Sequence, residues 1–186
     1  MNVLRGILDS ITNRLAFELD LSIGQPHLKG FSLPKDASGS SYTVSSGLLV
    51  MWDVAAPVIN PGDTRRQELA KLLEQPSSHP DVYSAYRFAC NQSDAVARFM
   101  FLYNILLQLH SDNQGQVDNF VRGETPTVPQ SLSPHNPSVT ETIYTRLRNE
   151  VGHRRAGITP EQTRTEIEDN IAGLQALVKV AISRAV

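Results

Sequence analysis

A short stretch of this sequence gathers the side chains that chemistry on a phosphodiester would need. Five cationic or imidazole side chains fall within ten residues: Arg146, Arg148, His153, Arg154 and Arg155. An imidazole can exchange a proton near neutral pH, and a guanidinium can grip two phosphate oxygens at once. The pattern therefore predicts a site that cleaves or binds a phosphodiester.

Each group has an expected role in such a reaction. RNA can be cleaved by its own 2′-hydroxyl if one group removes that proton and another protonates the leaving oxygen. His153 is the candidate for proton transfer, Arg148 for clamping the phosphate, and Asn149 for orienting the imidazole or a phosphate oxygen. The remaining arginines of the stretch, Arg146, Arg154 and Arg155, are candidates for holding flanking phosphates.

Structural roles could account for the same residues. Cations in the last turn of a helix interact favourably with the helix dipole, which would explain His153, Arg154 and Arg155 as C-terminal caps. Glu150 has the spacing to pair with Arg146 or Arg154. Glu141 is better explained as part of a capping box than as a catalyst.

The elements around the stretch are expected to be helices. Ser138 and Glu141 form a capping-box pattern that predicts a helix start, and Gly152 predicts its end. Thr159, Pro160 and Gln162 provide an N-cap, a proline at the first helical position and a capping-box partner. The sequence thus predicts a last helix that begins at Pro160, with the basic stretch directly before it.

Upstream, apolar residues recur at helical spacing from residue 81 to 109, and Ser93-Asp94 predicts a kink or a fresh N-cap inside that range. Asn104 within it is expected to be a buried, hydrogen-bonded amide rather than a polar group at a subunit interface. Residues 112–137 are rich in glycine and proline and predict a long connection, with room for a short helix over 116–121.

The first 62 residues differ from the rest in their pattern. Helical spacing over residues 3–15 gives way to strict alternation over residues 17–23, which predicts a half-buried strand. Residues 47–59 are apolar and β-leaning. The expected fold is mainly α: a small mixed α/β N-terminal segment over 1–62, followed by a four-helix up-and-down bundle over 63–186.

Composition restricts the function classes. The chain has 186 residues and a formal net charge of −2, so nucleic-acid binding would depend on a local basic patch. Cys90 is the single cysteine, and no group of residues at metal-ligand spacing accompanies the basic stretch, so no metal or cofactor is expected. No segment has the length and apolarity of a membrane span or a signal peptide, which predicts a cytoplasmic protein without a membrane partner.

Over about residues 81–186 the chain resembles the HEPN superfamily of helical domains. It is most similar to the branch of Apea-like and methylamine-utilisation-cluster proteins. The motif that carries the resemblance is Glu141-Thr142-x-Tyr144-x-x-Leu147-Arg148-Asn149-x-x-x-His153. Within it, Arg148, Asn149 and His153 match the family pattern of an arginine and a polar residue followed by a histidine ahead of the last helix. Residues 1–62 lie outside this resemblance.

The resemblance implies a metal-independent endoribonuclease that works at the two-fold interface of a homodimer. RNA is the implied substrate, a toxin or a stress or defence effector is the implied cellular role, and such a role allows for an antitoxin or a neighbouring-gene partner. An alternative stays open: a non-catalytic module that uses the same basic face to bind RNA, a nucleotide or a protein partner.

Overall fold

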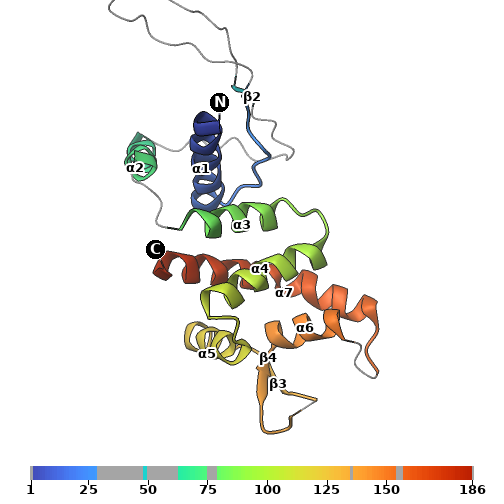
Figure 1. Cartoon of the computed structure of the whole chain (residues 1–186). Helices are drawn as coiled ribbons and strands as arrows, with labels where there is room; N and C mark the ends of the chain where they lie inside the picture. Colours follow the sequence, from blue (N-terminus) through green and yellow to red (C-terminus); the bar gives the residue numbers. More distant parts are fainter. Residues whose placement is uncertain are drawn as a thin grey trace, which may run out of the picture. The chain divides into compact units, whose positions relative to one another are not determined.

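The computed structural model describes residues 2–28, 48–49, 63–74, 79–134, 136–153 and 157–185. The protein is mainly α-helical, which confirms the predicted class. Its residues divide into two compact units, Met1–Arg87 and Phe88–Val186 (Figure 1). The predicted domain boundary after residue 62 lies at the edge of a range outside the described residues. Within the described part of the chain, no helix combines the length and apolarity needed to cross a membrane.

The described residues of the first unit form two helices, a two-stranded ladder and most of a third helix. In chain order these are α1 (Asn2–Leu19), β1 (His27–Leu28), β2 (Leu48–Leu49), α2 (Asp63–Glu74) and α3 (Pro80–Cys90), which continues into the second unit. β1 and β2 are antiparallel. The rest of the apolar stretch over 47–59 lies outside the described residues.

The strand predicted over residues 17–23 is wrong, because α1 continues through Leu19. Phe17 is buried, and its ring packs edge-on against Tyr83 and Tyr86 at centroid distances of 5.1 and 5.3 Å. The alternation of apolar and polar residues is short enough to fit one face of a helix as well as a strand. Aromatic packing from α3 selects the helix.

The second unit contains four helices after the end of α3 and one hairpin. They are α4 (Ala95–Leu109), α5 (Gln114–Glu124), β3 (Gln130–Leu132), β4 (Thr140–Thr142), α6 (Ile143–Gly152) and α7 (Pro160–Ala185). α4 lies against α7, and α6 packs on both of them (Figure 1). The fully buried side chains of this unit include Phe99, Leu106, Leu147, Ile167 and Leu174.

Residues 81–109 form two helices, and the fresh N-cap predicted between them is confirmed. The Asp94 carboxylate accepts a hydrogen bond from the Ala97 backbone N–H at 2.9 Å, and α4 begins directly afterwards. The expectation for Asn104 is wrong, because this residue is exposed on α4 and its amide is not part of the core.

The helix start predicted at Ser138 and Glu141 is also wrong. Glu141 lies in β4 opposite Ser131 of β3, and α6 begins only at Ile143. The hairpin places Glu141 in extended backbone, with the residue only 6% exposed. The short helix predicted over 116–121 is present and is longer, because Gly115 and Gly123 are both accommodated within α5.

The predicted end of α6 and the predicted start of α7 are both confirmed. α6 ends at Gly152. α7 begins at Pro160 with a reciprocal capping box, in which the Thr159 N–H donates to Gln162 Oε1 and the Gln162 N–H donates to Thr159 Oγ1. In the sequence, His153, Arg154 and Arg155 fall between these two helix ends.

Candidate functional site

Asn149 is the centre of a polar cluster that joins three elements. Its Nδ2 donates to Glu141 Oε1 of β4 at 3.1 Å, and its Oδ1 accepts from Gln114 Nε2 of α5 at 3.1 Å and from Arg148 Nη1 at 3.0 Å. Two donors on Oδ1 and one acceptor at Nδ2 fix the orientation of the amide. We call Gln114, Glu141, Arg148 and Asn149 the Asn149 cluster.

Arg148 has an unfulfilled donor in this cluster. Its Nε–H is shielded from solvent and has no hydrogen-bond partner, whereas Nη1 is held by Asn149. A buried donor without an acceptor costs about 1–3 kcal/mol, so most proteins avoid one. An anion that reached the guanidinium after a small rotation would supply the missing acceptor.

His153 is placed at the end of the same helix and is exposed. Its backbone N–H donates to the Asn149 carbonyl at 2.8 Å, so it forms the C-cap of α6, one turn beyond Asn149. Among the described residues, this backbone bond is what links His153 to the Asn149 cluster. The structure thus joins Arg148 and Asn149 through their side chains, and leaves the imidazole of His153 open to solvent.

A second polar network is centred on Asp118. Asp118 of α5 is 3% exposed, and its Oδ1 accepts from the Thr142 N–H at 3.0 Å, from Thr142 Oγ1 at 2.6 Å and from Thr145 Oγ1 at 2.7 Å. Since the single hydroxyl proton of Thr145 goes to Asp118, the Tyr103 hydroxyl must donate to Thr145 over their 2.7 Å contact. We call Tyr103, Asp118, Thr142 and Thr145 the Asp118 network.

The charges of both groups act on Tyr103. Burial raises the pKa of Tyr103 to about 12, with the carboxylates of Asp118 and Glu141 adding to the rise and the guanidinium of Arg148 opposing it. Arg148 and Glu141 are therefore close enough to this ring to be coupled electrostatically. The Asn149 cluster and the Asp118 network are thus coupled electrostatically at Tyr103.

This pKa predicts how stability depends on pH. The pKa of Tyr103 is higher in the folded protein than the ordinary value near 10, so the stabilisation is complete below pH 10 and falls as pH rises to 12. Two pKa units correspond to about 2–3 kcal/mol. Tyr103→Phe should be less stable than the wild type at pH 7 by about 1 kcal/mol, through the lost hydrogen bond.

Urea unfolding of both proteins between pH 8 and 12 checks this expectation. The deficit of Tyr103→Phe should shrink above pH 10 and reverse in sign near pH 11, while the other tyrosines titrate equally in both proteins. A difference in unfolding free energy that stays constant over this range would contradict the assigned environment of Tyr103.

Arg146 is engaged by acidic partners. It forms ion pairs with Glu150 at 2.8 Å and with Glu166 of α7, and its side chain is 17% exposed. The predicted pairing of Glu150 with Arg146 is thereby confirmed. These contacts tie α6 to α7, and any phosphate would compete with two carboxylates for this guanidinium. Arg154 and Arg155 lie outside the described residues.

The structure reveals site residues for which local sequence patterns gave no signal. Gln114, Tyr103 and Asp118 are brought to the motif from 24 to 42 residues away by hydrogen bonds. Glu141 carried only a misleading signal, because it has the spacing of a capping-box residue. Among the described residues, no three His, Cys, Asp or Glu side chains gather in a way that could hold a metal ion.

Comparison with known proteins was made at the level of family models, curated proteins and solved structures. No match was found in any of the three. The resemblance to the HEPN superfamily thus rests on the motif around Arg148 and His153, and it stays a prediction.

Proposed function

We propose that this protein is a metal-independent endoribonuclease of the HEPN type, with Arg148 and His153 as its catalytic residues. The observation that carries the proposal is the state of Arg148. Its guanidinium is held at Nη1 by the fixed amide of Asn149, while its buried Nε–H lacks an acceptor. A preoriented guanidinium with a donor still to satisfy is suited to a phosphate.

The reaction would proceed through the 2′-hydroxyl of the RNA. His153 accepts the 2′-hydroxyl proton as the 2′-oxygen forms a bond to phosphorus, and the bond from phosphorus to the 5′-oxygen breaks. Arg148 stabilises the charge that builds up on the non-bridging oxygens. The 5′-oxygen takes up a proton, so the products are a 2′,3′-cyclic phosphate and a 5′-hydroxyl end.

One imidazole cannot both accept and donate a proton in a single step. A homodimer with the two α6 ends facing each other would supply a second His153 as the acid, which is why the proposal includes a two-fold dimer. The exposed position of His153 supports this arrangement, since a group buried within its own protomer could not be shared. Cleavage of cellular RNA by such a dimer fits a toxin or a stress or defence effector.

The test of this proposal uses Arg148→Lys. Lysine keeps the charge but loses the planar fork, so turnover of a fluorescent RNA oligonucleotide at saturation should fall by about 100- to 1,000-fold, with RNA affinity much less affected. Arg184→Lys is the matched control, because Arg184 pairs with Glu124 and belongs to neither the Asn149 cluster nor the Asp118 network. Wild-type cleavage should persist in EDTA.

Two results would defeat the proposal. One is a wild-type protein that binds RNA without cleaving it, which would favour the non-catalytic module. The other is an Arg148→Lys variant with unchanged turnover. Cleavage that is lost in EDTA and restored by a divalent ion would overturn the metal-independent part alone.

A further inference from the structure

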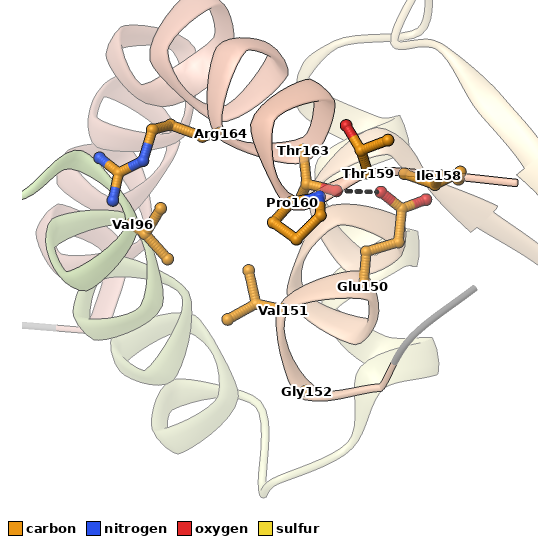
Figure 2. A pocket seen from close by; sticks show the side chains of 9 residues that line it. All are labelled: Val96, Glu150, Val151, Gly152, Ile158, Thr159, Pro160, Thr163 and Arg164. Atoms are coloured by element: carbon orange, nitrogen blue, oxygen red, sulfur yellow. Dashed lines mark hydrogen bonds between the residues drawn. The ribbon is translucent and has the colours of Figure 1, made fainter. Parts of the chain in front are cut away.

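A pocket lies at the C-terminal end of α6, and no residue of the Asn149 cluster lines it. It opens between the start of α4, the last turn of α6 and the start of α7, and encloses about 350 Å³ (Figure 2). Its wall includes Gly152, the residue directly before His153. Ligand sites of small molecules begin at about 300 Å³, so the pocket has the size for one aromatic base.

The walls of the pocket are apolar and come from three elements. Val96 of α4 stands on one side, with Val151 of α6 and Pro160 of α7 facing it across the hollow (Figure 2). Val151 is 38% exposed, although it lies in an amphipathic helix whose other apolar side chains are more deeply buried. Two apolar walls with a gap between them favour a flat, apolar-faced ligand.

The polar residues that line the pocket are Glu150, Thr159, Thr163 and Arg164. Arg164 extends along the rim beside Val96, and its guanidinium is held by Asp94 at 2.8 Å (Figure 2). A guanidinium fixed in this way presents a flat face on which a base can stack. α6 ends at this wall. The Asn149 carbonyl accepts from the His153 N–H, and the later carbonyl groups of this last turn could accept hydrogen bonds from the amino group of a base.

Glu150 also borders the pocket, but its carboxylate is engaged. Its side chain is 1% exposed, and it binds Arg146 and the Thr163 hydroxyl. Recognition would thus rely on the apolar walls, Arg164 and the backbone rather than on this charge.

We propose that this pocket binds the nucleobase adjacent to the scissile phosphate. The inference rests on the proposed nuclease function for the position of the phosphate, and it adds a subsite that gives the enzyme a preference for the neighbouring base. The contact follows from adjacency: Gly152 lines the pocket and the next residue carries the imidazole.

Filling the pocket tests the proposal. The probes are the four nucleoside 3′-monophosphates, titrated into the full-length protein and followed by ¹H–¹⁵N NMR. At least one should shift the amide signals of Thr163 and Arg164, and Val151→Phe should weaken its binding by about tenfold or more, because the new ring occupies the space of the base. Val139→Phe is the matched control, since Val139 is exposed and lies outside the pocket wall.

Val96→Phe, on the opposite wall, should weaken nucleotide binding as Val151→Phe does. It keeps the test valid if one of the two variants does not fold. The proposal is overturned if no nucleotide shifts these amides, or if binding survives both changes. A third result would also overturn it: the wild type binds no nucleotide, and light scattering shows that Val151→Phe dissociates a dimer. The pocket would then receive a side chain of a second copy of the chain.

The cleavage assay separates this inference from the proposed function. A wild-type protein that binds nucleotides in the pocket but cleaves no RNA would refute the nuclease and leave the base site intact. A wild-type protein that cleaves without base preference, and equally well after Val151→Phe, would refute the base site and leave the nuclease intact.

Discussion

His153→Ala should remove RNA cleavage, lowering turnover at saturating RNA by about 100- to 10,000-fold, the range of a lost general acid or base. RNA binding should stay close to that of the wild type, because the arginines that we propose to bind phosphates are unchanged. The structure indicates that this substitution leaves the fold of α6 unchanged. The side chain is exposed, and the hydrogen bond that caps α6 comes from the backbone N–H of the residue, which alanine retains.

The competing role of His153 is favourable interaction with the helix dipole, and it predicts a different result. In that case the free energy of unfolding would fall by no more than about 1 kcal/mol, and the wild type would have no cleavage to lose. His79→Ala is the matched control, since His79 is an exposed histidine before α3. If His79→Ala reduced cleavage as much as His153→Ala, the assignment of the catalytic imidazole would be wrong.

Asp118→Ala should destabilise the second unit by about 3–5 kcal/mol. One carboxylate oxygen accepts hydrogen bonds from the Thr142 N–H and from the hydroxyls of Thr142 and Thr145, all of them in buried residues. Alanine would leave three donors without an acceptor, at about 1–3 kcal/mol for each that cannot turn to another partner. This is a large part of the stability of an ordinary domain.

Urea unfolding followed by circular dichroism measures this loss. Asp169→Ala, at an exposed position of α7, is the matched control and should change the unfolding free energy by less than about 0.5 kcal/mol. Asp118→Asn keeps an acceptor oxygen, so its loss of unfolding free energy should lie between those of Asp118→Ala and Asp169→Ala. If Asp118→Ala were as stable as the control, the hydrogen bonds of the Asp118 network would not be what holds the start of α6 on α5.

The Asp118 network also links stability to the proposed site. Thr142 and Thr145 flank the start of α6, and α6 carries Arg148 and Asn149 on its following turns. The hairpin of β3 and β4 is held on α5 by Arg122, whose Nη2 donates to the Thr140 carbonyl. Glu141 is thereby fixed where Asn149 can reach it. A rigid support of this kind is what a preoriented guanidinium requires.

The sequence by itself determined the features that depend on neighbouring residues. The N-cap at Asp94, the end of α6 at Gly152 and the capping box of Thr159 and Gln162 are all predicted from local patterns and confirmed. A cap is a contact between residues three positions apart, so its chemistry is visible in a short window. The helical class follows for the same reason, because a period of 3.6 residues repeats within each element.

Only the tertiary structure decided the features that depend on distant partners. Glu141 fits the capping-box pattern, but its backbone pairs with Ser131 in a strand. Its carboxylate accepts a hydrogen bond from Asn149. Arg146 appears as one of several cations in the sequence, but Glu166, twenty residues later, neutralises it from α7.

The residues of the Asn149 cluster and the Asp118 network likewise could not be predicted from local sequence. Gln114 and Asp118 stand in a stretch with no distinctive pattern, and they become site residues because α5 folds back onto α6. The composition of a motif shows which chemistry is available. Which of its groups remain open to a ligand depends on contacts across tens of residues, and no local spacing encodes them.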